Sequence, residues 1–74
     1  MTQTILEIEG MMCSMCQAHI NDAIRRAFPV KSVKSAHRKG RTVILSAAPL
    51  DREALYAVIR NTGYTLLGIT ETEQ

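Results

Sequence analysis

Apolar and polar residues alternate near the start of the chain. Between residues 4 and 9, Leu6 and Ile8 fall on one side of an extended backbone, and Glu7 and Glu9 fall on the other. Strict alternation of this kind is typical of a strand with one face buried and the other exposed to water. The sequence therefore predicts a first strand over residues 4–9.

The spacing of apolar residues changes from two to three or four beyond residue 14. Four positions follow the i, i+3, i+4, i+7 pattern of one helical face: Ile20, Ala23, Ile24 and Ala27. We expect a helix from about residue 14 to about residue 28. Pro29 ends it, because proline disfavours helical geometry in the residue before it.

A hairpin is predicted next. Its strands are expected at residues 32–38, where Val33 and Ala36 are apolar, and at residues 42–46. Lys39-Gly40 between them is typical of a hairpin turn.

A second helix and a last strand complete the pattern. Asp51 is a favourable N-cap, and Gly63 suits the residue just beyond the helix C-terminus. The expected buried stripe of this helix consists of Leu55, Val58 and Ile59. We expect the last strand at about residues 64–70 and a frayed tail at residues 71–74.

The resulting order is strand, helix, strand, strand, helix, strand, with short connections. This order is typical of the α+β, ferredoxin-like (βαββαβ) arrangement, in which two helices pack on one face of a four-stranded antiparallel sheet. The 74 residues are expected to form a single domain, residues 1–74, with a core over about residues 4–70. A chain of this size has room for one core and for no large pocket.

Charge is unevenly distributed. The formal net charge is +2, and no acidic residue occurs between Arg25 and Arg41, an interval that holds most of the basic ones. This stretch is either a solvated surface or a surface that attracts an acidic partner. Nucleic acid is not expected as a partner, because the basic residues lack interleaved aromatic side chains for stacking.

Membrane insertion is not expected either. No apolar run approaches the roughly 20 residues that a membrane-spanning helix needs, and the first residues do not resemble a signal peptide. We therefore expect a cytoplasmic protein. Thiols are kept reduced in that compartment, so its two cysteines are expected to be ligands or redox-active groups and not a structural disulfide.

The cysteines lie in the segment that joins the first strand to the first helix. Cys13 is expected in the loop and Cys16 in the first helical turn, so that both sulfurs can converge on one ion. The N–H groups and the dipole at a helix start favour negative charge there. Two thiolates suit Cu(I), which accepts two soft ligands, whereas Zn²⁺ prefers four ligands.

Two motifs resemble the heavy-metal-associated domain family, which includes copper chaperones and the metal-binding domains of copper-exporting P-type ATPases. Met11-x-Cys13-x-x-Cys16 follows the first strand, as the family's MxCxxC does, and Gly63-Tyr64 precedes the last strand. The resemblance extends over almost the whole chain and implies the same βαββαβ fold.

The resemblance also implies roles for individual residues. Cys13 and Cys16 would be the metal ligands, with Cys13 the more exposed and the first to be attacked during transfer. Met11 would be a buried anchor of the loop and not a ligand, and Tyr64 would lie near the thiolates. Met12 is apolar where zinc-selective relatives usually carry an acidic residue, which argues against zinc.

Several residues near the motif remain open to more than one interpretation. His19, one turn after Cys16, is either a solvent-facing side chain or a third ligand. Met12 and Met15 pack within the loop, form an apolar rim that docks a partner, or bind metal directly. His37 is expected to be solvated.

The expected function is that of a cytosolic, non-enzymatic metallochaperone. It would bind one Cu(I) per monomer, or one bridging a homodimer, and deliver it by thiolate exchange to the metal-binding domain of a copper-transporting P-type ATPase. One alternative is a domain of a larger transporter or of a mercury-handling protein, with Hg(II), Ag(I) or Cd(II) as the ion. Another is a thiol-disulfide oxidoreductase, since CxxC between a strand and a helix also occurs in thioredoxin-like enzymes.

Overall fold

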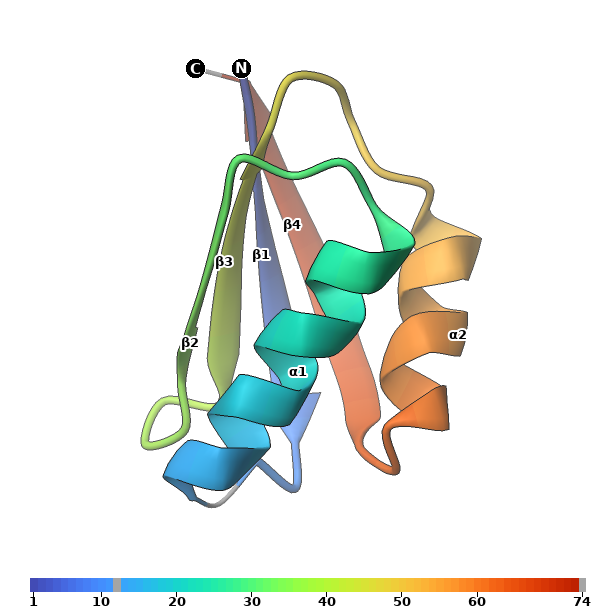
Figure 1. Cartoon of the computed structure of the whole chain (residues 1–74). Helices are drawn as coiled ribbons and strands as arrows, with labels where there is room; N and C mark the ends of the chain where they lie inside the picture. Colours follow the sequence, from blue (N-terminus) through green and yellow to red (C-terminus); the bar gives the residue numbers. More distant parts are fainter. Residues whose placement is uncertain (12, 74) are drawn as a thin grey trace.

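The computed structural model describes residues 1–11 and 13–73. Its elements are β1 (Thr2–Glu9), α1 (Ser14–Ala27), β2 (Ser32–Ala36), β3 (Arg41–Ser46), α2 (Arg52–Asn61) and β4 (Thr65–Glu73). The strands form one antiparallel sheet in the order β2-β3-β1-β4, and both helices lie on the same face of it (Figure 1). The predicted α+β, ferredoxin-like fold is confirmed.

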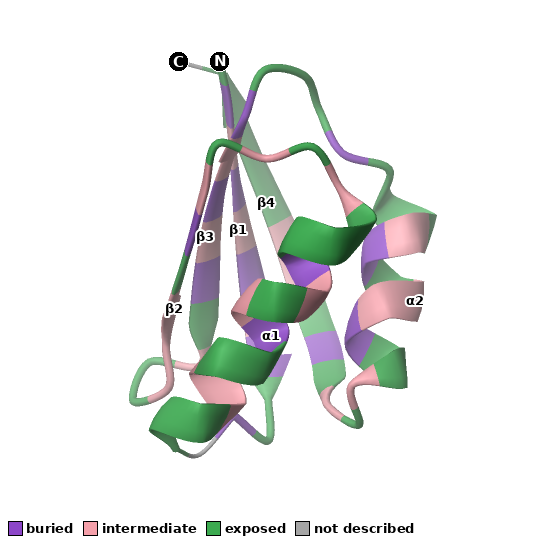
Figure 2. Cartoon of the chain, viewed as in Figure 1, coloured by how far each residue is buried: buried purple, intermediate pink, exposed green. Residues whose placement is uncertain are grey.

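The core fills the layer between the sheet and the two helices. Figure 2 shows the buried residues on the inward sides of both helices and at alternating positions along β1 and β3. The fully buried aliphatic side chains come from both layers: Leu6, Ile20, Ile24, Ile44, Leu55 and Ile59. Burying each such side chain contributes roughly 1.5–3 kcal/mol, so this layer supplies most of the driving force for folding.

The two helices end largely where the sequence predicts. The Asp51 side chain accepts a hydrogen bond from the Ala54 N–H at 3.3 Å, which confirms the predicted cap of α2. Gly63 has the positive φ of +93° expected just beyond the helix end. In α1 the expected burial of Ala27 is wrong. Ala27 is the last helical residue and is exposed, and the Phe28 side chain packs against the core instead.

The ends of the strands differ from the predictions. The expected frayed tail is wrong for residues 71–73, because β4 continues to Glu73 and pairs with β1 as far as Thr2. The Glu73 carboxylate accepts hydrogen bonds from the N-terminal ammonium at 3.0 Å and from the Thr2 hydroxyl at 2.9 Å. These contacts lower the pKa of Glu73. β2 is shorter than predicted, because residues 37–40 form the turn, with Gly40 at a φ of +64°.

An irregularity in β4 sets which of its side chains face the helices. Glu7 pairs with Gly68 while Ile8 pairs with Leu66, so Leu67 is an extra residue in β4. In a regular strand Leu66 and Ile69 would point to opposite faces, and the bulge lets both pack against the core. Leu67 remains 59% exposed.

No helix in the described part of the chain is long and apolar enough to cross a lipid bilayer.

Candidate metal centre

The loop from β1 to α1 turns sharply at Gly10. Its φ is +97°, a conformation that side-chain-bearing residues rarely adopt. A Cβ atom at this position would lie 3.2 Å from Cδ1 of Tyr64, so the absence of a side chain also lets the tyrosine ring approach the loop. The next residue, Met11, is only 3% exposed and belongs to the core, where it holds the loop against the domain.

Cys13 and Cys16 lie on either side of the helix start. Cys13 is the N-cap of α1, with extended backbone, and its carbonyl accepts a hydrogen bond from the Gln17 N–H at 3.3 Å. Its side chain makes no capping hydrogen bond and is exposed. Cys16 is in the first helical turn and half-buried, packed against the core.

The two sulfurs are close together without being bonded. Sγ of Cys13 lies 2.9 Å from Sγ of Cys16, and neither residue forms a disulfide. The first turn of α1 contains no acidic residue, so nothing in that turn opposes the positive end of the helix dipole. The arrangement offers one ion two sulfur donors at an exposed, electrostatically favourable position.

Tyr64 forms the other wall of the centre. A hydrogen bond to Cys16 raises the pKa of the Tyr64 phenol, and burial and the neighbouring charges of Cys16 and Cys13 raise it further. The hydroxyl therefore stays protonated and can donate its hydrogen to the Cys16 sulfur. The family resemblance implied that Tyr64 lies near the cysteine sulfurs, and the raised pKa of Tyr64 is a direct physical consequence of that position.

The fold that carries this candidate centre also occurs in solved structures. No protein-family model matches the chain. Among solved structures, oxidized MerP from Ralstonia metallidurans CH34 is 26% identical, with a TM-score of 0.74, and the match covers 90% of this chain and 96% of that one. By its fold and its MxCxxC motif, the chain resembles heavy-metal-associated domains.

Two further solved structures share the fold of this chain. The CopZ metallochaperone is 23% identical with a TM-score of 0.77, and the match covers 88% of this chain and 98% of that one. A copper binding domain from HMA7, a P-type ATPase, is 19% identical with a TM-score of 0.78, with 93% and 97% coverage. In each case the similarity spans nearly the whole of both chains.

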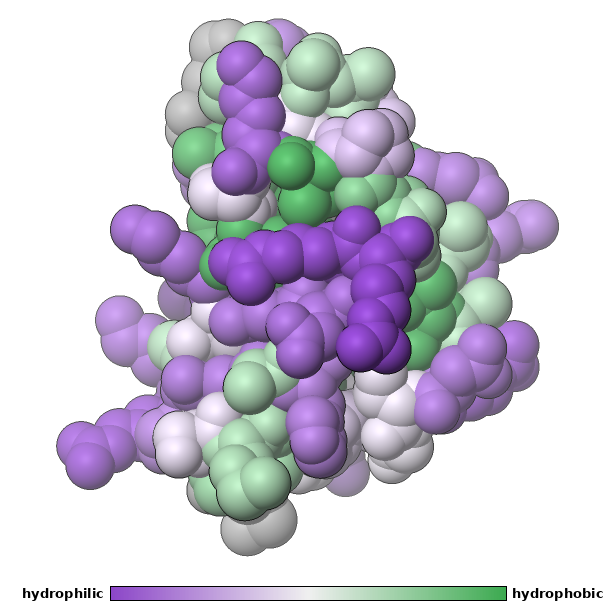
Figure 3. All heavy atoms as spheres, in the orientation of Figure 1, coloured by the Kyte–Doolittle hydropathy of each residue, from purple (hydrophilic) through white to green (hydrophobic). Residues whose placement is uncertain are grey.

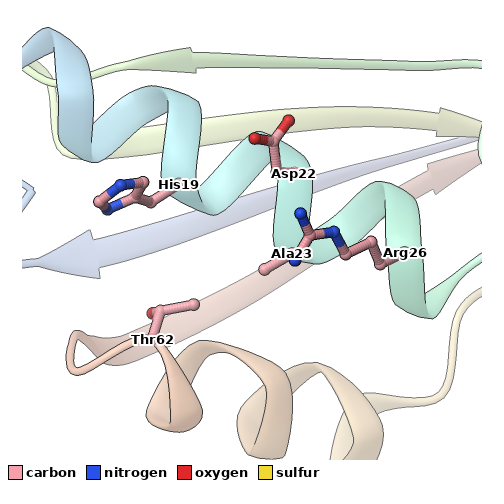
Figure 4. A pocket seen from close by; sticks show the side chains of 5 residues that line it. All are labelled: His19, Asp22, Ala23, Arg26 and Thr62. Carbon is pink, nitrogen blue, oxygen red and sulfur yellow. The ribbon is translucent and has the colours of Figure 1, made fainter.

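His19 does not join the two cysteines. Within residues 1–11 and 13–73, no three His, Cys, Asp or Glu side chains lie close enough to share an ion. His19 is exposed on α1 and lines a hollow of about 270 Å³ between the two helices, together with Asp22, Ala23, Arg26 and Thr62 (Figure 4).

His37, in contrast, has a structural role that the sequence did not reveal. Its backbone N–H donates to Oε1 of Gln17 at 2.7 Å, and its Nδ1 makes a second hydrogen bond to the same oxygen. An amide oxygen only accepts hydrogen bonds, so Nδ1 carries the proton. The expectation of a solvated His37 is wrong: this residue attaches the hairpin turn to the helical turn that holds Cys16. No periodic pattern signals such a long-range contact.

The structure tests the interpretations of Met15 but not those of Met12. Met15 is 69% exposed, which excludes packing within the loop and leaves the other two interpretations, an apolar rim and metal binding, open. Met12 lies outside the described residues. Figure 3 shows moderately hydrophobic atoms at the lower end of the helical face, where α1 begins, whereas hydrophilic side chains dominate the middle of that face.

Basic side chains lie at the same end as the cysteines. The Ile8 N–H donates to the Gly40 carbonyl at 2.7 Å, which holds the β2–β3 turn beside the end of β1. Arg38 and Lys39 are exposed in that turn, and Figure 1 shows it at the end of the molecule where α1 starts. The surface around the start of α1 is therefore partly cationic.

Proposed function

We propose that this domain binds one Cu(I) ion between Cys13 and Cys16 and passes it to the metal-binding domain of a copper-transporting P-type ATPase. One observation carries the proposal: two sulfurs lie 2.9 Å apart at an exposed helix start. Within the described part of the chain, no third His, Cys, Asp or Glu side chain joins them. Two soft donors without a third favour an ion that accepts low coordination.

The choice of Cu(I) over zinc follows from this donor set. Zn²⁺ in structural sites takes four protein ligands, and even catalytic sites supply three. With two thiolates and no carboxylate or imidazole beside them, the domain would leave zinc with water or a second molecule as its remaining ligands. Cu(I), in contrast, needs no ligand beyond two thiolates.

Loading would require the two sulfurs to separate. Metal–thiolate bonds are about 2.3 Å long for zinc, so a near-linear ion of similar size needs its two sulfurs roughly 4–5 Å apart. Cys13 can provide this movement because its side chain is exposed and makes no capping hydrogen bond. Cys16, packed against the core and hydrogen-bonded to Tyr64, would stay in place.

Transfer would proceed by ligand exchange. A cysteine thiolate of the partner attacks the ion beside the exposed Cys13, giving a three-coordinate intermediate shared by the two proteins. The bond to Cys13 then breaks, and a second thiolate of the partner replaces Cys16 in the same way. In each exchange one metal–sulfur bond replaces another, so no free ion is released. The existence of the same fold in the CopZ metallochaperone and in a copper binding domain of a P-type ATPase supports a donor and an acceptor of matching shape.

The proposed function also suggests where the protein acts and what charge its partner carries. Thiols must stay reduced to bind the ion, which favours the cytoplasm. Arg38 and Lys39 near the loop would speed the encounter with an acidic acceptor surface, because opposite charges raise association rates. A metal-bridged homodimer is expected at high concentration, since an exposed two-coordinate ion can recruit thiolates from a second copy.

Competition with a Cu(I) chelator tests the ligand assignment. Cys13→Ser and Cys16→Ser should each weaken Cu(I) binding by several orders of magnitude, because a single thiolate remains. Ser14→Ala, at the exposed residue between them in the motif, is the matched control and should bind as the wild type does. Unchanged affinity in either cysteine variant would overturn the proposal. Sustained turnover in an insulin-reduction assay would instead indicate a thiol oxidoreductase.

A further inference from the structure

Met15 and His19 form a pair of metal-binding side chains that the fold does not use. Met15 is 69% exposed, although a methionine gains by burial. His19 is also exposed, and it takes part in no hydrogen bond or ion pair within the described part of the chain. Both donor atoms are therefore available to a ligand from solution.

The helix brings these two side chains to the same place. Residues four apart on an α-helix are surface neighbours, with about 5–6 Å between their Cβ atoms. Long helical side chains also lean toward the helix N-terminus. In Figure 4 the His19 ring extends from α1 toward the blue end of the chain, where the helix begins. The ring therefore extends toward the first turn of α1, the turn to which Met15 belongs.

The chemistry of the pair matches the ion of the proposed function. A thioether is a soft donor and an imidazole suits copper, and Cu(I) accepts two such ligands. We propose that Met15 and His19 form a second, weaker Cu(I) site on the exposed side of α1, which holds the ion as it enters or leaves the cysteine pair. This proposal rests on the proposed function, because it assumes that Cu(I) reaches the loop.

Met15 and His19 would bind the ion as neutral donors, so this site should have a lower affinity than the cysteine pair. Two thiolates bring negative charge to a monovalent cation, whereas a thioether and a neutral imidazole bring none. An ion on Met15 and His19 is therefore expected to move on to Cys13 and Cys16 by exchange, one metal–donor bond forming as another breaks. The oxidation state of copper does not change in any step.

The chain contains its own matched controls. Met11 is 3% exposed and lies in the core, so its sulfur is out of reach. His37 lies in the β2–β3 turn, outside α1, where its Nδ1 bonds to Gln17, so it is not the helical partner of Met15. A soft ion that binds through the proposed pair should therefore shift the signals of Met15 and His19 and leave those of Met11 and His37 unchanged.

The direct test removes the thiolates and follows the pair by NMR. The Cys13→Ser, Cys16→Ser double variant is titrated with Ag(I), a soft monovalent ion that is stable to oxidation, and its folded state is checked from its amide spectrum. We expect the Met15 methyl and the His19 ring signals to shift together and saturate at one equivalent. Met15→Leu, which keeps the apolar volume, or His19→Gln should each abolish the shift at the other residue.

Signals that do not move, or a Met15 shift that persists in the His19→Gln variant, would overturn the proposal. If the double variant does not fold, wild-type protein with one Ag(I) already bound is given a second equivalent, with the same two outcomes. The two proposals fail separately. Wild-type protein that does not take the first equivalent at its cysteines refutes the proposed function, whereas a silent Met15–His19 pair on a loaded protein refutes this one.

Discussion

Two regions of the molecule differ in the exposure of their side chains. One is the core layer between the sheet and the helices, and the other is the segment that carries the cysteines. In the layer, aliphatic side chains such as Leu6 and Ile24 are fully buried. At the start of α1, Cys13 and Met15 are exposed, and potential ligands stay accessible. Met11 and Tyr64 connect the two regions, since both pack against the core while lying beside the loop. Stability and metal binding should therefore respond to different substitutions. Only substitutions where the two regions meet, near Met11 and Tyr64, should change both.

The largest effect is expected from a cavity in the core layer. Ile24→Ala removes a fully buried side chain of α1 and should lower the free energy of unfolding by about 2–5 kcal/mol. Urea denaturation measures the loss. The exposed neighbour Arg25 provides the control, because Arg25→Ala should change stability by less than about 0.5 kcal/mol. A cost below 1 kcal/mol at Ile24 would show that the layer is not the main source of stability.

An intermediate effect is expected at the connection between the two regions. Gly10→Ala places a Cβ at a φ of +97° and 3.2 Å from the Tyr64 ring, so it should cost about 1–3 kcal/mol of stability and also weaken Cu(I) binding. Gly68→Ala is the matched control, because a Cβ there meets no atom within 4 Å and needs no left-handed backbone. Equal costs for the two variants would contradict the proposed role of the Gly10 turn.

A smaller effect is expected at the Tyr64 hydroxyl. Tyr64→Phe keeps the ring and removes the hydrogen bond to Cys16, so Cu(I) affinity should change roughly fivefold, with only a small loss of stability at neutral pH. Chelator competition and urea denaturation on the same sample separate the two quantities. A large loss of stability would assign Tyr64 to the core layer alone.

The same hydrogen bond determines a pH dependence. The pKa of Tyr64 is raised in the folded state, so its contribution to stability is fully present below the ordinary tyrosine pKa of about 10 and is lost as the pH rises through the higher folded value. Ultraviolet titration in a Tyr56→Phe background isolates the Tyr64 phenol. Cys16→Ser should move its midpoint down toward the ordinary value, and an unmoved midpoint would remove Cys16 as the main cause.

The sequence predicts well what depends on local patterns. Alternation in β1, helical spacing around Ile20 and Ile24, and the cap at Asp51 all follow from side chains within one element. The MxCxxC spacing indicates the metal loop in the same way, because both cysteines lie within four residues of one helix start.

Features that depend on contacts between distant segments were not predictable. The extension of β4 to Glu73 depends on pairing with Thr2, across almost the whole chain, and its polar sequence carries no strand signal. The His37–Gln17 contact joins the hairpin turn to α1 in the same long-range way. The exposure of Met15 depends on which way the first helical turn faces, and spacing alone does not fix that direction.

The coordination of the bound metal is the most direct test of the account. X-ray absorption on protein loaded with Cu(I), together with competition between Cu(I) and Zn(II) for the same sample, measures both the donor set and the selectivity. We predict two sulfur neighbours in the monomer, a near-linear geometry, and binding of Cu(I) in preference to Zn(II) by many orders of magnitude. A site that binds zinc as tightly as copper, or that shows nitrogen and oxygen donors in place of the two sulfurs, would contradict the central claim.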